Sequence, residues 1–166
     1  MSSGSPDPRR WNQFLSEALR AVRRARSLRA QDVAEAMGMP QRSYEYFEAG
    51  GGKLNVERVY AFAEATRSDP FAILAATLMQ SPAFAARATR NKLMLTYMLS
   101  LREFDAEVGD DIDLLETSAL LAGFSEMFAK LAAEARKRRE MLDSLERAAR
   151  TWGQGGAVPP DGSDVP

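Results

Sequence analysis

The 166-residue sequence contains no cysteine and no histidine. Without these residues the chain cannot form a disulfide or the common zinc sites, and it cannot carry thiol catalysis or a Ser-His-Asp triad. No run approaches the ~20 consecutive apolar residues of a membrane-spanning helix, and the first residues lack the apolar centre of a signal peptide. We therefore expect a cytoplasmic protein with no metal, no other cofactor and no membrane partner.

The net charge of −1 conceals an uneven distribution of charge along the chain. Residues 9–68 contain 11 basic and 7 acidic side chains, a net charge of +4, whereas the rest of the chain contains 11 basic and 16 acidic side chains, a net charge of −5. A basic front half fits a DNA-contacting module that is attached to another region. Solvated surface charge also varies by this much in ordinary proteins, so charge alone leaves both interpretations open.

Two short amphipathic helical patterns meet at Gly38. Glycine adopts the left-handed conformation easily, so Gly38 can end the first helix of the pair. The second helix is predicted over about residues 40–49, with Tyr44 and Phe47 on its buried face, and the glycines 50–52 follow it. Two helices joined by a short turn that contains glycine are typical of a helix-turn-helix unit.

This stretch resembles the DNA-binding domain of the lambda-repressor-like (Cro/repressor, XRE) family. The positions that match the family pattern are Arg23, Arg26, Leu28, Val33, Ala34, Gly38, Met39, Gln41, Tyr44, Phe47, Glu48 and Gly50. The resemblance continues through Val59, residues 61–63 and residues 69–71, and it covers about residues 11–80. It implies an all-α fold in which a five-helix domain binds double-stranded DNA.

The start of the first helix of the motif departs from the family. The family has Ser or Thr and then Gln there, whereas this chain has Arg29 and Ala30. An arginine side chain cannot accept hydrogen bonds from backbone amides, so we expect a frayed start or a cap from Ser27. The missing glutamine removes one contact with the DNA backbone, and Arg29 is a candidate to replace it with a charge-assisted one.

The resemblance implies that the second helix of the motif lies in the major groove and reads base edges. Gln41 could pair with adenine or hold a phosphate, and Arg42 could pair with guanine. Ser43 permits close approach, Tyr46 could contact a thymine methyl or a phosphate, and Glu45 could accept from cytosine or repel phosphate. For each of these residues the alternative is an ordinary solvated helix surface.

The turn after this helix is a candidate phosphate contact. Glycine amides and a lysine side chain can bind the DNA backbone, and such contacts do not depend on the base sequence. We expect a flexible turn in which Gly51, Gly52 and Lys53 lie near phosphates. In the family, an arginine and a glutamate at the positions of Arg23 and Glu48 form a partly buried ion pair. We therefore assign this pair a structural role.

Ser81 and Pro82 mark the best domain boundary. The predicted segments are a disordered N-terminus (1–8), a helix-turn-helix DNA-binding domain (9–80), a helical dimerisation or interaction region (81–152) and a disordered tail (153–166). The third segment should begin with a helix of some 25 residues. A long helix, capped by Asp110 or Asp111, should follow and end near residue 152.

The long helix carries apolar or small residues at alternating spacings of three and four, with Arg138 as a charged exception. This spacing is typical of a coiled coil. A helix of about 40 residues reaches ~60 Å, and a partner chain is the simplest way to bury its seam. The predicted dimerisation residues are Tyr97, Met98, Leu101, Leu121, Phe124, Phe128, Leu131, Leu142 and Leu145.

The sequence favours a transcriptional repressor that binds a two-fold operator as a homodimer and associates with a bacterial or phage nucleoid. Its recognition helices would lie about one DNA turn, ~34 Å, apart. The alternative is a helix-turn-helix adaptor or antitoxin-like protein whose helical region binds another protein; the near-neutral charge and Glu45 favour it. No enzyme is expected, because the acid pair Asp110 and Asp111 precedes a helix, where carboxylates are ordinary caps.

Overall fold

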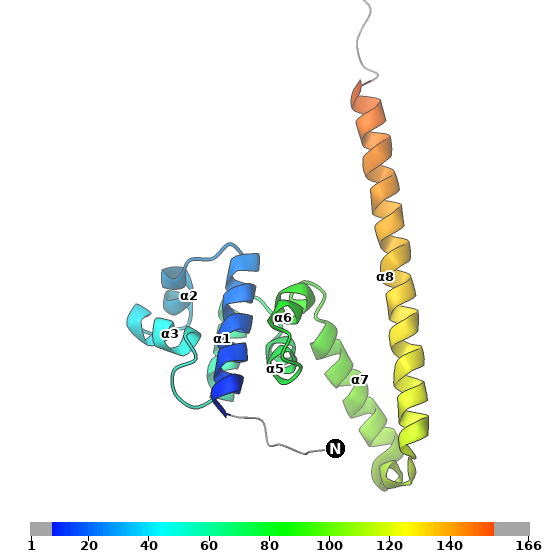
Figure 1. The fold of residues 1–166 in the computed structure, drawn as a ribbon, viewed down its shortest axis with the longest axis horizontal. Helices are drawn as coiled ribbons and strands as arrows, with labels where there is room; N and C mark the ends of the chain where they lie inside the picture. Colours follow the sequence, from blue (N-terminus) through cyan, green and yellow to red (C-terminus); the bar gives the residue numbers. More distant parts are fainter. Residues whose placement is uncertain (1–7, 155–166) are drawn as a thin grey trace, which may run out of the picture. The chain divides into compact units, whose positions relative to one another are not determined.

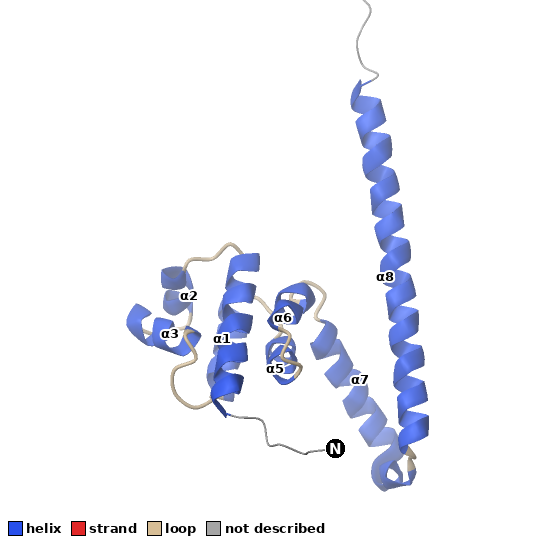
Figure 2. Cartoon of the chain, viewed as in Figure 1, coloured by secondary structure: helices blue, strands red, loops and turns tan. Residues whose placement is uncertain are grey.

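The computed structural model describes residues 8–154, and every regular element among them is helical (Figure 2). The elements are α1 (Pro8–Ala25), α2 (Ala30–Ala36), α3 (Gln41–Glu48), α4 (Val56–Ala65), α5 (Pro70–Leu78), α6 (Pro82–Ala88), α7 (Leu93–Val108), the 3-10 helix η1 (Gly109–Leu114) and α8 (Thr117–Gln154). The predicted all-α fold is confirmed, and the segment in which five helices are predicted contains α1 to α5. The predicted disordered segments lie outside the described residues, except that Pro8 begins α1 and residues 153–154 end α8.

The chain divides into two compact units, Met1–Gly109 and Asp110–Pro166. In the first unit, α1 lies at the centre and packs against α3, α5 and α6. Figure 1 shows α2 and α3 on one side of α1 and α5 and α6 on the other. The side chains of Leu19, Val22 and Phe62 are fully buried between these helices. The amphipathic α1 therefore holds the helix-turn-helix pair to the rest of the unit.

Three aromatic rings form the centre of the core beneath α3. The ring of Tyr44 lies 6.5 Å from Phe47 in an edge-to-face arrangement and 6.4 Å from the stacked ring of Phe62, measured between centroids. Aromatic pairs at these separations stabilise a core beyond the area that they bury. The apolar face of α3 is thereby fixed against α4.

Local capping residues set the starts of α4 and α5. The side-chain oxygen of Asn55 accepts a hydrogen bond from the backbone amide of Arg58 at 2.9 Å. The carboxylate of Asp69 accepts from the amides of Phe71 and Ala72 at 3.0 and 3.3 Å, and Pro70 occupies the first helical position. Each cap satisfies amides that have no partner within their own helix.

The predicted helix of 25 residues after residue 81 is wrong, because the chain breaks between α6 and α7. Lys92 adopts a left-handed backbone, with φ of +54°, and its ammonium group donates a hydrogen bond to the carbonyl of Ser68 at 2.7 Å. Asp69, which is fully buried, also accepts from the amide of Leu95 at 2.9 Å, so one carboxylate caps both α5 and α7. These contacts fix the start of α7 against α5.

Helix α6 packs against α1 and α5, and its residues Ala85 and Ala88 are buried. The guanidinium group of Arg26 donates to the carbonyl groups of Arg67 and Thr89. These contacts tie the end of α1 to the loop between α4 and α5 and to the loop between α6 and α7. The first compact unit is therefore longer than the segment 9–80. That segment remains a prediction about which residues bind DNA.

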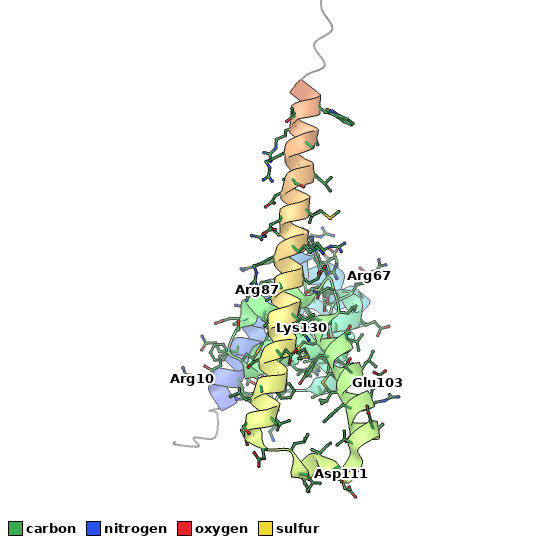
Figure 3. The ribbon with its side chains drawn as sticks, turned by 90° about the vertical axis from the view of Figure 1, so that its right-hand side faces the viewer. Arg10, Arg67, Arg87, Glu103, Asp111 and Lys130 are labelled. Carbon is green, nitrogen blue, oxygen red and sulfur yellow. The ribbon has the colours of Figure 1, made fainter. Side chains whose placement is uncertain are left out.

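The second unit consists of residues 110–114 of η1 and helix α8. Asp110 and Asp111 lie within η1, so the prediction that one of them caps the long helix is wrong; the carbonyl of Glu116 accepts the first hydrogen bonds instead. Among the described side chains of this unit, all but Met127 are exposed, and Figure 3 shows Lys130 and others projecting from α8. Within residues 8–154, no helix combines the length and the apolar character needed to cross a membrane.

Candidate nucleic-acid interface

The turn between α2 and α3 is built from local backbone hydrogen bonds. Gly38 has a φ of +63°, and the amide of Met39 donates to the carbonyl of Ala34 at 3.0 Å. The carbonyl of Pro40 then accepts from the amides of Ser43 and Tyr44 as α3 begins. Gly38 adopts this left-handed backbone without the strain that a side chain would add. The predicted turn is confirmed, and it sets the angle between α2 and α3.

Helix α3 has a buried face and an exposed face. Tyr44, Phe47 and Glu48 point into the unit and are buried. The exposed face carries all five of the predicted base-reading residues: Gln41, Arg42, Ser43, Glu45 and Tyr46. Tyr46 is 61% exposed, which is high for a tyrosine in a folded domain. The structure therefore brings these polar side chains together on one surface that the core does not use.

Two of these residues also contact each other, a pairing that the sequence did not predict. The side-chain amide of Gln41 donates a hydrogen bond to the carboxylate of Glu45 at 2.7 Å. Residues four apart on a helix lie on the same face, so the spacing already permitted this pair. The contact occupies one oxygen of Glu45 and orients Gln41 along the axis of α3.

The start of α2 differs from both predicted outcomes, a frayed start and a cap from Ser27. The carboxylate of Asp32 accepts a hydrogen bond from the backbone amide of Arg29 at 3.3 Å, and it accepts two more from the Arg29 guanidinium group at 2.7 and 3.0 Å. The predicted cap from Ser27 is therefore wrong. Arg29 remains 78% exposed as a side chain, so it is accessible at the N-terminal end of the motif. The hydrogen bond from Arg29 lowers the pKa of Asp32.

Arg23 of α1 and Glu48 of α3 form a bidentate ion pair. The Arg23 Nε lies 2.6 Å from Glu48 Oε1, and Nη2 lies 3.0 Å from Oε2. The Tyr44 hydroxyl donates to the same carboxylate at 2.7 Å, and Arg23 Nη1 donates to the carbonyl of Leu28 at 3.2 Å. This cluster joins the end of α3 to α1 and to the loop before α2.

The charges in this cluster stabilise each other despite partial burial. Burial raises the pKa of Glu48, but the hydrogen bonds from Arg23 and Tyr44 outweigh it, so the pKa lies below its ordinary value. The hydrogen bond with Glu48 raises the pKa of Arg23. Burial, and then the hydrogen bond to Glu48, raise the pKa of the Tyr44 hydroxyl. All three groups therefore keep their ordinary protonation states at neutral pH.

A helix-turn-helix family model matches residues 19–72, from within α1 to the first turn of α5. Residues 19–72 are thus similar to the helix-turn-helix domain of lambda-repressor-like proteins. The match covers about a third of the chain. A search of curated proteins and a search of solved structures each returned no match. The helix-turn-helix domain indicates a DNA-binding regulatory protein, and domains of this kind typically carry no enzymatic activity.

The glycine turn of the helix-turn-helix domain is tied to α1, although the sequence predicts a flexible turn. The side-chain amide of Asn12 donates to the carbonyl of Gly52 at 3.0 Å. A Cβ atom on Gly50 would lie 2.5 Å from the Asn12 carbonyl oxygen, and one on Gly51 would lie 2.5 Å from the ring of Tyr46. The turn can therefore approach the backbone of α1 this closely only because residue 50 is a glycine. Lys53 follows it and is exposed.

No sequence pattern pointed to Asn12, because its contact with Gly52 spans 40 positions and depends on the packing of α1. The predicted dimerisation residues lie outside the family match. In α7, Tyr97 and Met98 are half-buried and Leu101 is exposed. The remaining six lie on α8 and are all exposed: Leu121, Phe124, Phe128, Leu131, Leu142 and Leu145. Their role in dimerisation remains a prediction.

Within residues 8–154, no group of three or more acidic or metal-binding side chains is placed to hold a metal ion.

Proposed function

We propose that the chain is a sequence-specific transcriptional repressor that binds a two-fold operator as a homodimer. The observation that carries this proposal is the exposed polar face of α3. This face stands on a helix whose opposite side is locked into the core by Tyr44, Phe47 and the pair of Arg23 with Glu48. A rigid helix with accessible polar side chains suits base recognition, because binding then orders few additional groups.

In this proposal Arg42 makes the main base contact. Its guanidinium group is exposed near the N-terminal end of α3, where helix-turn-helix proteins contact base edges. Arginine donates two parallel hydrogen bonds to guanine O6 and N7, the commonest specific contact. Gln41 and Glu45, which are already paired with each other, read a neighbouring base or position Arg42. Ser43 and Tyr46 complete the surface toward the DNA.

The DNA backbone is held at both ends of the motif. Arg29 lies before α2, and Lys53 with Gly51 and Gly52 lies after α3. Asn12 holds this second region against α1 through Gly52, so the turn is presented in one place. Contacts to phosphates fix the register of a protein on DNA but carry no sequence information directly. They also weaken with salt, because binding releases counterions.

The dimer supplies the affinity that one small domain lacks. A single α3 reaches only a few base pairs, and phosphate contacts alone give weak, salt-sensitive binding. The exposed apolar residues of α8 support pairing with a second chain, because a long helix with one apolar stripe is rarely stable alone in water. Two-fold pairing predicts two inverted half-sites separated by whole turns of DNA.

In-vitro selection of random duplexes with the full-length protein tests this proposal. We expect an inverted repeat to be enriched. Replacing Arg42 with alanine should weaken binding to that sequence by about 1–3 kcal/mol and relax preference at one base pair in each half. Arg87, an exposed arginine of α6 (Figure 3), serves as the control. Replacing it with alanine should leave binding to the enriched sequence unchanged. An enriched sequence without symmetry would contradict the dimer, and unchanged binding by the Arg42 variant would contradict the role of Arg42.

A helix-turn-helix adaptor that binds a protein instead of DNA is the second candidate. Two intramolecular pairs favour it: Gln41 with Glu45, and Arg29 with Asp32. Each pair uses polar groups that a DNA-binding surface would otherwise offer to the duplex. Binding to random duplex at several salt concentrations separates the two functions. A DNA-binding protein shows affinity that falls steeply with salt, whereas an adaptor shows no binding even at low salt.

A further inference from the structure

Side chains from two helices hold the glycine turn, residues 50–53. From α1, the side-chain amide of Asn12 donates to the carbonyl of Gly52 at 3.0 Å. From α3, the ring of Tyr46 lies against Gly51: a Cβ atom there would lie 2.5 Å from Cζ, 2.6 Å from Cε2 and 2.7 Å from Cδ2 of the ring. No side chain fits at residue 51 while the ring keeps its place, so one edge of the ring rests on the main chain of Gly51. We use the name turn clamp for Asn12 and Tyr46.

Two of the four backbone amides in this turn are already used. The amides of Gly50 and Gly51 donate to carbonyl groups of α3, each at 2.9 Å, and these bonds close the end of that helix. Over residues 8–154, the amides of Gly52 and Lys53 donate to no backbone acceptor, and both residues are exposed. These two amides are therefore the ones that the turn can offer to a phosphate. Gly51 contributes space for the ring of Tyr46 and not its amide.

Asn12 fixes the direction of the peptide group between Gly52 and Lys53. The carbonyl oxygen and the amide hydrogen of a trans peptide point in opposite directions, and residues 8–154 contain no cis peptide bond. Because the Gly52 carbonyl faces Asn12, the Lys53 amide faces away from it. The side chain of Lys53 is exposed and carries the charge that complements a phosphate. The amide and the ammonium group of one residue are thus both available to one anion.

We propose that Asn12 and Tyr46 are positioning residues, which hold the amide and the ammonium group of Lys53 in place for one phosphate of the DNA backbone. This inference rests on the DNA binding of the proposed function and specifies how its second backbone contact is built. It assigns Tyr46 to the glycine turn instead of to a base edge.

The direction of the Tyr46 ring supports this assignment. Helix-turn-helix proteins contact base edges mainly from the N-terminal end of the second helix, where Arg42 lies. The ring of Tyr46 instead extends to the turn beyond the C-terminal end of α3. Its other edge also reaches this turn, because Cε1 would lie 3.8 Å from a Cβ atom on Gly52. The ring therefore spans Gly51 and Gly52.

The turn clamp restrains a segment that would otherwise be mobile. Glycine has more backbone freedom than any other residue, so ordering three consecutive glycines costs much conformational entropy. A turn that is ordered before binding avoids this cost when it meets DNA. Contacts with phosphates do not depend on the base sequence. The turn clamp should therefore raise the affinity for every duplex by the same factor.

Fluorescence anisotropy of full-length variants tests the inference with two probes, a random duplex and the duplex enriched by selection. Tyr46→Ala should weaken binding to both probes by the same factor, about 3- to 10-fold, which is the cost of ordering the turn during binding. Tyr46→Phe keeps the ring and should recover this loss. Asn12→Ala removes the other half of the turn clamp and should weaken binding to both probes alike.

Tyr60→Ala is the matched control. Tyr60 is an exposed tyrosine of α4, and its ring packs edge-on against Phe71 and not against the glycine turn. Replacing it with alanine should leave the affinity for both probes unchanged.

Double-mutant cycles with the random duplex show which group Tyr46 acts through. Combined with Lys53→Ala, Tyr46→Ala should weaken binding less than it does alone, because much of the contact that it positions is already lost. Combined with Arg42→Ala, it should weaken binding by the same factor as it does alone. A purely structural loss would be equal in the two backgrounds.

Several results would overturn the inference. Loss of preference at one base pair in Tyr46→Ala would make Tyr46 a base-reading residue. A loss that Tyr46→Phe does not recover would place the hydroxyl group on the DNA. Unchanged binding by Tyr46→Ala, or a loss that is fully independent of Lys53→Ala, would show that Tyr46 does not act through the turn.

NMR order parameters of the free protein separate the turn clamp from DNA binding. The backbone order parameters of residues 51–53 should fall in Tyr46→Ala, because the turn then moves more freely. Unchanged order parameters would overturn the turn clamp and leave the proposed function intact. A wild-type protein that binds neither duplex would instead overturn the proposed function, and with it the phosphate contact at Lys53.

Discussion

Arg23 and Glu48, which are 25 positions apart in the chain, form two hydrogen bonds that join α1 to the C-terminal end of α3. The side chain of Arg23 is 18% exposed and that of Glu48 is 8% exposed, so water screens the pair only weakly. The same carboxylate accepts from Tyr44, whose ring lies in the aromatic centre of the core. The pair therefore links the packing of the core to the orientation of the exposed face of α3.

Replacing Arg23 with alanine should destabilise the domain by about 2–4 kcal/mol, because Glu48 would keep its burial and lose both charged donors. Urea unfolding followed by circular dichroism measures this loss. Arg24→Ala is the control, because Arg24 is the next residue of α1 and is exposed. We expect a change within about 0.5 kcal/mol for the control. Equal losses in the two variants would show that the ion pair does not hold α3.

The same pair predicts how stability depends on pH. The folded pKa of Glu48 lies below its unfolded value, so the pair stabilises the fold fully above the unfolded pKa, about 4.3, and this stabilisation is lost as the pH falls through the folded pKa. The difference in unfolding free energy between wild type and Glu48→Gln should therefore be largest near pH 7 and should shrink below about pH 4. Denaturant titrations at pH 7 and pH 3 measure it. A difference that stays constant over this range would contradict the assignment.

The parts of the fold that the sequence predicted are those that depend on neighbouring residues. Gly38 lies at the end of α2 as predicted, and Asn55 and Asp69 begin α4 and α5 through contacts within a few positions. The break at Lys92 was missed, because the residues around it include no glycine or proline. A contact with Ser68, 24 positions away, accompanies its left-handed backbone. Such contacts depend on how helices pack, which helical periodicity does not encode.

In the candidate site, too, the features that depend on neighbouring residues were predicted and those that depend on helix packing were not. The composition of the exposed face of α3 followed from the spacing of Tyr44 and Phe47, since the residues between buried positions must face outward. The tie between Asn12 and Gly52 did not follow from any local pattern, because α1 must first dock beside the turn. The sequence thus predicted which residues face outward but not how the glycine turn beside them is held.

Replacing Gly50 with alanine should destabilise the domain more than the same change at Gly38. Both glycines have a positive φ, +79° and +63°, so both substitutions strain the backbone by about 1 kcal/mol. Only at Gly50 would the new Cβ meet another group, the carbonyl oxygen of Asn12 at 2.5 Å; at Gly38 nothing lies within 4 Å. We expect a loss of about 2–3 kcal/mol at Gly50 and about 1 kcal/mol at Gly38. Thermal unfolding compares them, and equal losses would argue against close packing of the turn on α1.

Replacing Lys53 with alanine should weaken DNA binding without changing which sequence is preferred. Lys53 is exposed beside the glycine turn, and the proposed function assigns its ammonium group to a phosphate and not to a base edge. Loss of one phosphate contact should reduce the slope of log affinity against log salt by about 1, with a similar loss of affinity for operator and random duplex. Fluorescence anisotropy at several salt concentrations measures both quantities. Arg42→Ala is the matched comparison, because it should weaken operator binding more than random binding. A Lys53 variant that behaved like the Arg42 variant would place the turn in the groove instead of on the backbone.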